Sequence, residues 1–138
     1  MNQRIKIFIV EYDCVNLITM MLWLDQYAEF DVLGTTVDTG NLRGQIRELK
    51  PDVVLLDVET PGPEDIPQLR DIKSTEPKPA VVLLYQGDAS ELQGILSDES
   101  DGAVGRNSTL GELYETVMQA YNRRHVIRSA ALPVARAG

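Results

Sequence analysis

The segment PDVVLLDVETP, residues 51–61, constrains the fold of this chain more than any other stretch. Its apolar run, Val53 to Leu56, leads without a polar break into Asp57, and a proline stands at each end of the segment. A short apolar run rich in β-branched residues is typical of a strand buried on both faces of a parallel sheet. Asp57 then lies at the carboxyl end of the strand, where open α/β sheets bind ligands. The same residue could instead simply open a turn.

The chain alternates predicted strands and helices from residue 5 to residue 124. Continuous apolar runs predict strands at residues 5–10, 31–37, 53–56, 80–85 and 102–105. Helical spacing of apolar residues predicts helices at residues 14–27, 41–50, 64–74, 88–97 and 109–124. Five such repeats predict an α/β fold with a doubly wound, five-stranded parallel sheet and helices on both faces. The flavodoxin-like strand order 2-1-3-4-5 is the leading candidate.

The first predicted helix is rich in apolar residues. Val15, Ile18 and Leu22 recur at helical spacing, and Tyr27 lies one turn further on. This stripe is widened by Leu17, Met20, Met21 and Leu24. Trp23 and the methionines of the helix are most simply core residues. We expect this stripe to face the core and the whole helix to be well buried.

The length of 138 residues suits one domain with a real core. We expect a domain over residues 1–124 and a linker-like or frayed tail over residues 125–138, because the segment SAALPVARAG has no helical period. The single cysteine, Cys14, excludes an internal disulfide and fits a reducing compartment. No stretch approaches the length of a membrane span, so we expect a cytoplasmic protein without membrane contact.

The net charge of −8 is unevenly distributed along the chain. All 21 acidic residues precede position 122, whereas four of the 13 basic residues follow it. An acidic body repels nucleic acid, so we expect no direct nucleic-acid binding by this domain.

The predicted topology brings polar side chains together at one edge of the sheet. In the 2-1-3-4-5 order, strands one, three and four are adjacent and strand five lies beside strand four. The residues at this edge are Glu11, Tyr12, Asp13, Asp57, Tyr85 and Arg106. Carboxylate oxygens suit Mg²⁺. Crowded carboxylates repel one another, so the site requires a metal, a proton or Arg106 folded inward. Asp57 is the best candidate nucleophile, because a carboxylate can form an aspartyl phosphate with Mg²⁺ neutralising the phosphoryl charge.

Four blocks, FIVEYD, PDVVLLDVETPG, VVLLYQGD and SDGAVGRNS, together resemble the receiver domain of response regulators over about residues 4–124. In the most specific block, Asp57 and Pro61 match the family's phospho-accepting aspartate and the proline four residues on. The segments GNLRGQIRELKPD and DGAVGRNSTLGEL look most like receivers attached to helix-turn-helix outputs. The resemblance implies phosphorelay signalling, with Asp57 as phospho-acceptor and a histidine kinase or phosphotransfer protein as partner. It also implies a homodimer through helix four, strand five and helix five.

The chain departs from the family's pattern at five places, of which the simplest is Thr60 in place of the usual methionine before Pro61. Tyr12 replaces the second of two adjacent acidic residues that hold Mg²⁺, and Ala103 stands where an aromatic is usual. Tyr85 replaces the switch serine or threonine, and Arg106 replaces a lysine. Arginine keeps the positive charge but forks between acceptors, so Arg106 could pair with Asp57 and imitate the resting or the phosphorylated state.

These departures predict a weakened Mg²⁺ site, with Glu11, Asp57 and the backbone carbonyl of Glu59 as the remaining ligands. Two functions stay open: a phosphorylatable receiver, and a phosphorylation-independent module for dimerisation or protein interaction. A faint likeness of Asp57-Val58-Glu59-Thr60 to the nucleophile motif of haloacid-dehalogenase-type phosphatases is a third interpretation. That family carries the motif in its first strand and needs more chain, so we expect no enzyme.

Overall fold

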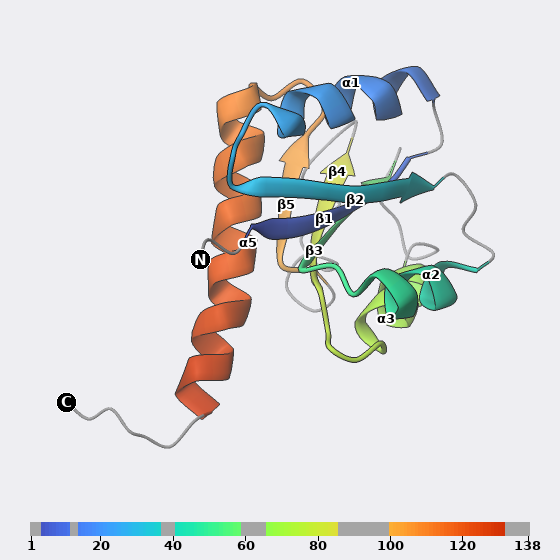
Figure 1. Cartoon of the computed structure of the whole chain (residues 1–138), viewed down its shortest axis with the longest axis vertical. Coiled ribbons are helices and arrows are strands. Elements are labelled where there is room, and N and C mark those ends of the chain that lie inside the picture. The colour runs from blue at the N-terminus through green and yellow to red at the C-terminus, as the bar shows by residue number, and fades with distance from the viewer. Residues whose placement is uncertain (1–3, 12–13, 37–40, 59–65, 86–99, 132–138) are drawn as a thin grey trace.

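Five parallel strands form one sheet in the order β2-β1-β3-β4-β5, which confirms the predicted topology (Figure 1). The computed structural model describes residues 4–11, 14–36, 41–58, 66–85 and 100–131. The strands are β1 (Ile5–Val10), β2 (Phe30–Thr36), β3 (Val53–Val58), β4 (Ala80–Tyr85) and β5 (Gly102–Gly105). The helices are α1 (Cys14–Asp25), α2 (Leu42–Leu49), α3 (Ile66–Lys73) and α5 (Leu110–Ala131). The helix predicted at residues 88–97 falls outside the described residues.

Alternate residues of the central strands pack into two cores, one on each face of the sheet. On one face, Ile7, Leu55 and Val82 pack with residues of α1 and α5. On the other face, neighbouring strand residues such as Val54 and Leu83 pack with residues of α2 and α3. Because side chains alternate along a strand, continuous apolar runs are what a sheet covered on both faces requires. No helix in the described part of the chain is long and apolar enough to cross a membrane.

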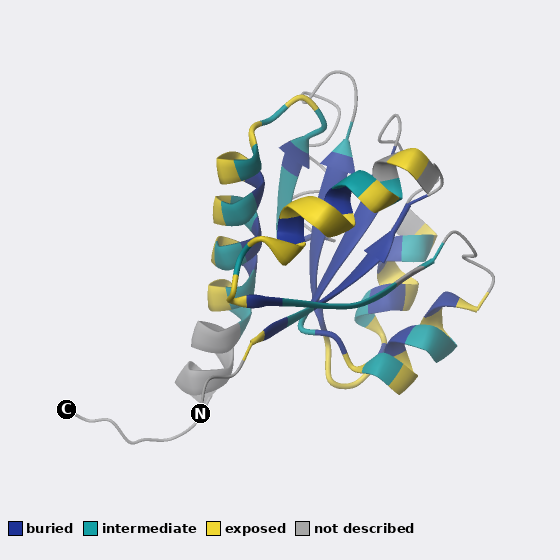
Figure 2. Ribbon diagram, turned by 45° about the horizontal axis from the view of Figure 1, so that its top comes forward, coloured by how far each residue is buried: buried dark blue, intermediate teal, exposed yellow. Residues whose placement is uncertain are grey.

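Helix α1 buries only part of the wide apolar stripe that the sequence predicts. Val15, Ile18 and Leu22 are 71%, 57% and 64% exposed, whereas Met20 and Leu24 are buried against the sheet. Figure 2 shows the exposed positions along this helix in yellow. The prediction was wrong because the helix is apolar nearly all round, so helical spacing cannot distinguish its inner stripe from its outer one.

Helix α5 begins at the predicted capping box and extends past residue 124. The Thr109 backbone N–H donates to Glu112 Oε1 at 2.8 Å, and the Glu112 N–H donates to Thr109 Oγ1 at 3.1 Å. The helix continues to Ala131, so the expected linker-like tail is helical in its first part. Residues 132–138 lie outside the described residues.

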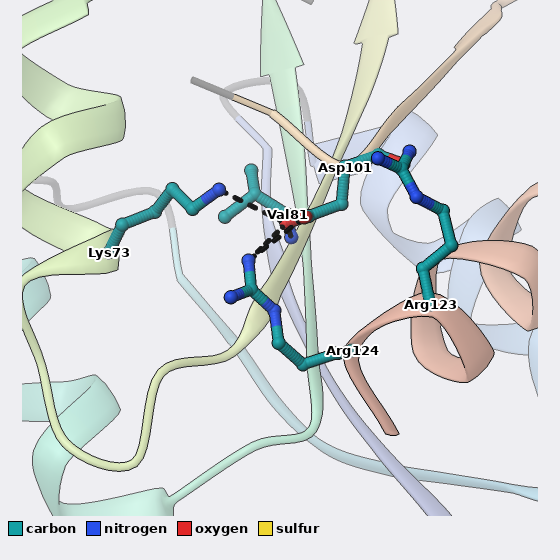
Figure 3. A network of polar contacts seen from close by, with 5 residues as sticks. All are labelled: Lys73, Val81, Asp101, Arg123 and Arg124. Carbon is teal, nitrogen blue, oxygen red and sulfur yellow. Dashed lines mark hydrogen bonds and ion pairs between the residues drawn. The ribbon is translucent and has the colours of Figure 1, made fainter. Parts of the chain in front are cut away.

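Asp101 directly precedes β5, at the amino-terminal end of the sheet, whereas Asp57 lies at the carboxyl end. It connects the helices on the two faces of the sheet (Figure 3). Its carboxylate accepts the Val81 N–H at 2.8 Å and two hydrogen bonds from Arg124 at 2.9 and 3.0 Å. Lys73 of α3 approaches the same carboxylate at 3.4 Å, and Arg123 donates to the Asp101 carbonyl at 3.1 Å. One side chain thus connects β4, α3 and α5.

Replacing Asp101 by asparagine is expected to lower the free energy of unfolding by about 2 kcal/mol, because mostly buried cations lose their counter-charge. Chemical denaturation measures this change. Asp71→Asn is the matched control, since the pair of Asp71 with Arg43 spans 3.9 Å with both side chains about half exposed. That control is expected to cost at most about 0.5 kcal/mol. Equal losses in the two variants would contradict a special role for Asp101.

Three rings anchor the start of α5 to the turn before β2. Tyr114 stacks on Tyr27 with ring centroids 4.4 Å apart and also contacts Phe30 at 5.5 Å. The Tyr114 hydroxyl donates to Glu29 Oε2 at 2.7 Å. This hydrogen bond lowers the pKa of Glu29 below its ordinary value of 4.5 and raises the pKa of Tyr114 above 10.0.

The hydrogen bond between Tyr114 and Glu29 predicts that the stability of the fold changes with pH at both low and high pH. The stabilisation linked to the lowered pKa of Glu29 is present above pH 4.5 and is lost as the pH falls through the folded-state pKa. That linked to the raised pKa of Tyr114 is present below pH 10.0 and is lost as the pH rises through its folded-state pKa. In Tyr114→Phe, an NMR titration should find the pKa of Glu29 raised toward 4.5. An unchanged pKa would show that the hydrogen bond does not form in solution.

Candidate functional site

The sheet brings Glu11 and Asp57 together at the carboxyl ends of β1 and β3. The two strands pair with Val10 opposite Leu56, so the next residue of each strand lies at the same level of the sheet. The Glu11 N–H donates to the Thr36 carbonyl at 3.1 Å, which fixes its backbone beside β2. Both side chains are almost fully buried, with Glu11 1% and Asp57 3% exposed.

Arg106 lies between these two carboxylates. It follows β5, and its backbone N–H donates to the Tyr85 carbonyl at 2.8 Å, which holds the residue beside the end of β4. Its Nε donates to Asp57 Oδ1 at 2.8 Å. Its Nη2 contacts the same Asp57 oxygen and donates to Glu11 Oε1 and Oε2 at 3.1 and 3.3 Å. One guanidinium therefore bridges both acids.

The bridging arginine resolves the electrostatic problem of the acidic pair. Two adjacent carboxylates in a buried position repel each other unless a cation neutralises part of their charge. Of the three solutions expected from the sequence, the structure has Arg106 folded inward, with its side chain 24% exposed. When all three groups are ionised, the site keeps a net charge of −1.

The predicted Mg²⁺ ligands are brought together only in part. Glu11 and Asp57 are hard oxygen donors of the kind that Mg²⁺ prefers. The Arg106 guanidinium already lies between them and makes charge-assisted hydrogen bonds to both. Glu59 and Tyr12 lie outside the described residues. Within the described part of the chain, no group of three or more acidic, histidine or cysteine side chains is placed to hold a metal ion.

Tyr85, one of the two predicted switch positions, packs against β5. It pairs with Gly105 across the strands, and its ring atoms lie 3.7–3.8 Å from the position that a Cβ on Gly105 would take. The half-buried ring joins the core on the α2 and α3 face, together with Ala103. The small residues at positions 103 and 105 thus leave room for a large ring at position 85.

A compact cavity next to the site was not anticipated from the sequence. It lies between α1, the ends of β4 and β5, and the start of α5, and Glu11 and Arg106 form part of its wall. Its α1 residues, such as Met20 and Trp23, looked like ordinary core residues. No spacing in the sequence distinguishes a residue that lines a cavity from one that fills a core.

Comparison with known proteins identifies the class of fold. No family model matches the chain. The signal receiver domain of a modulated diguanylate cyclase from Desulfovibrio desulfuricans G20 aligns with a TM-score of 0.76 and 16% identity, over 91% of this chain and 99% of that one. The response regulator domain of Thermotoga maritima CheB aligns with a TM-score of 0.73 and 21% identity, over 87% of this chain and 98% of that one. The chain has the fold of a response-regulator receiver domain.

A curated relative supports the same class at the level of sequence. A protein-glutamate methylesterase/protein-glutamine glutaminase of Syntrophus aciditrophicus is 27% identical over 137 residues, which is 91% of this chain. The match spans 39% of the length of that protein. The resemblance to receiver domains stated from the sequence is thereby confirmed, and the methylesterase activity belongs by name to a much longer protein.

Proposed function

We propose that this chain is the receiver domain of a response regulator in two-component phosphorelay signalling, with Asp57 as the phospho-acceptor. The observation that carries the proposal is the position of Asp57, a buried carboxylate at the carboxyl end of the central strand. Arg106 contacts it and also contacts a second buried acid, Glu11. A carboxylate held in this way is a nucleophile with a fixed direction of attack.

The transfer itself follows from the chemistry of the acceptor. An Asp57 carboxylate oxygen attacks the phosphorus of a phosphohistidine in the donor protein, the phosphorus–nitrogen bond breaks, and its electron pair returns to the imidazole. When bound, Mg²⁺ supplies neutralisation of the phosphoryl charge, and Glu11 and Asp57 are the residues that would hold it. Arg106 must release Asp57 Oδ1 before that oxygen can react, so we expect the unmodified domain to accept phosphate slowly.

The same contacts favour a second function. Arg106 gives both buried carboxylates a permanent counter-ion within the chain, which is the role that a metal would otherwise have. A domain whose acidic site is complete in this way can act as a phosphorylation-independent dimerisation or protein-interaction module. Its proposed dimer face includes the predicted helix four, which lies outside the described residues, together with β5 and α5.

Labelling with a small phosphodonor separates the two functions. The protein is incubated with acetyl phosphate and Mg²⁺, and the intact mass is measured beside a receiver known to be labelled under the same conditions. The first function predicts addition of one phosphoryl group to the wild type and none to Asp57→Asn. No adduct on the wild type, with the reference receiver labelled, would favour the second function. Labelling of both the wild type and Asp57→Asn would refute Asp57 as the acceptor.

The exposed apolar stripe of α1 is the proposed docking surface for the phosphodonor protein. Val15, Ile18 and Leu22 lie along the exposed side of α1, and this helix begins shortly after Glu11 and lines the same cavity as Glu11 and Arg106. Large exposed apolar residues grouped on one face mark interaction sites.

The absence of enzymatic activity, a cytoplasmic location and homodimerisation belong to the same proposal as predictions.

Ile18→Glu is expected to slow phosphotransfer from a histidine kinase that labels the wild type by about tenfold or more, since a buried charge disrupts an apolar contact. Gel-based transfer kinetics measure the rate. Labelling by acetyl phosphate should be unchanged, because the substitution lies on an exposed face. Gln119→Glu on exposed α5 is the matched control. Equal slowing by both substitutions would place the docking surface elsewhere.

A further inference from the structure

The cavity beside the acidic site is partly open to solvent, and its surface is mainly apolar. Its volume is about 100 Å³, and it lies between Thr19, Met20 and Trp23 of α1 and Leu113 of α5, with Val104 of β5 in its lining. Met20, Val104 and Leu113 are buried. Small-molecule sites are concave and mostly apolar, with a few polar groups that fix the orientation of the ligand. This space has those features on a small scale.

The polar groups around the cavity restrict the chemistry of that occupant. The Thr19 hydroxyl donates to the Val15 carbonyl at 2.9 Å, and the Thr109 hydroxyl is engaged with Glu112. Both hydroxyls are satisfied within their own helix ends, and Ser108 adds one more hydroxyl to the lining. Most of the lining surface is apolar, so the cavity offers water few partners. A charged occupant would be costly against this wall, because its surface is mainly apolar and the charged residues in it, Glu11 and Arg106, already pair with each other. An anion would also meet the net negative charge of the site formed by Glu11, Asp57 and Arg106.

We propose that this cavity binds a small, uncharged molecule of about one ring with at most one polar group. The volume of about 100 Å³ limits the occupant to this size, because a somewhat larger apolar cavity of roughly 150 Å³ in another protein accepts one benzene ring. Trp23, which is 39% exposed, lines the cavity at the surface of α1, and Arg106 lines it beside the acidic site. An occupant therefore contacts the residue that controls Asp57. An effect of the occupant on phosphorylation of Asp57 rests on the proposed function, whereas binding of the occupant in the cavity does not.

The test is an NMR titration of the whole chain with benzyl alcohol, with benzoate as the charged probe of the same size. Trp23 is the only tryptophan, so its indole N–H gives one resonance without assignment ambiguity. The proposal predicts saturable shifts of the Trp23 indole and the Arg106 Nε–H, with a dissociation constant of about 1 mM for so small a ligand. Benzoate should bind at least about tenfold more weakly, which is the cost expected from placing a charge against this wall.

Two variants distinguish the cavity from general stickiness of the apolar helix. Thr19→Phe places a ring at the lining of the cavity and should weaken benzyl alcohol binding at least about tenfold by filling the space. Ile18→Phe adds the same ring on the exposed side of α1 and should leave binding unchanged. Far-ultraviolet circular dichroism checks that both variants fold, and Val104→Phe replaces Thr19→Phe if that variant does not. Non-saturating shifts, equal binding of benzoate, or equal effects of the two α1 variants would overturn the proposal. Neither the ligand titration nor the comparison of variants depends on phosphorylation of Asp57.

Discussion

Replacing Arg106 by alanine is expected to lower the free energy of unfolding by about 3 kcal/mol near pH 7. The substitution removes the guanidinium that contacts both Glu11 and Asp57 and leaves two buried carboxylates at adjacent strand ends. Loss of one partner from a buried ion pair typically costs about 3–5 kcal/mol, and the partial exposure of Arg106 puts this case at the lower end.

Denaturant titration monitored by circular dichroism measures the loss, and two controls define its origin. Arg43→Ala removes an exposed arginine whose ion pair with Asp71 spans 3.9 Å, and it should cost at most about 0.5 kcal/mol. Adding Asp57→Asn to Arg106→Ala should restore part of the lost stability, because one of the two facing charges is removed. The account of the site is contradicted if Arg106→Ala costs no more than Arg43→Ala.

Replacing Arg106 by lysine is expected to accelerate labelling of Asp57 by acetyl phosphate by about tenfold or more. Lysine carries a compact charge without the planar fork, so it cannot hold Asp57 Oδ1 and Glu11 in the arrangement that Arg106 adopts. Releasing one hydrogen bond to a charged group is worth about 1.5–3 kcal/mol, which is about one to two orders of magnitude in rate.

The labelling rate is measured from intact mass against time at fixed Mg²⁺, with Asp57→Asn in the lysine background as the negative control. A slow wild type and a fast Arg106→Lys would show that the guanidinium restrains an otherwise competent acceptor. Equal rates in the two proteins would show that the contact with Asp57 does not limit the transfer. An unlabelled lysine variant would support the phosphorylation-independent function.

The arrangement of the sheet could be predicted because its strands have unusually clear apolar patterns in the sequence. Runs such as VVLL before Asp57 have no polar position, which only a sheet covered on both faces accommodates. Once the strand order was fixed, the ends of β1, β3 and β5 had to converge. The meeting of Glu11, Asp57 and Arg106 therefore followed from topology rather than from any local pattern.

Other features were not predictable for identifiable physical reasons. The outer face of α1 carries Ile18 and Leu22, which a periodicity argument assigns to the core as readily as Met20 and Leu24. Asp101 precedes a short strand, in a stretch of small and acidic residues that is typical of a turn. Its cationic partners are distant in sequence. The choice between a metal, a proton and Arg106 at the acidic site depends on side-chain geometry, which spacing along the chain does not encode.

The arrangement of Arg106 between the two acids also gives Mg²⁺ a competitor within the chain. A metal ion that uses both carboxylates must displace two charge-assisted hydrogen-bonded contacts, so its apparent affinity is reduced by the stability of the paired state. The same competition applies to both proposed functions, since it concerns the resting site and not the fate of a phosphoryl group.

The most direct test of this account is a Mg²⁺ titration of the wild type and of Arg106→Ala, followed by NMR shifts of the Glu11 and Asp57 backbone amides. Arg43→Ala serves as the control for loss of an arginine. If Arg106 is the resident cation of the site, Arg106→Ala binds Mg²⁺ at least about tenfold more tightly than the wild type, as expected when a competing contact worth about 1.4 kcal/mol or more is removed. Equal or weaker Mg²⁺ binding by a folded Arg106→Ala would contradict it.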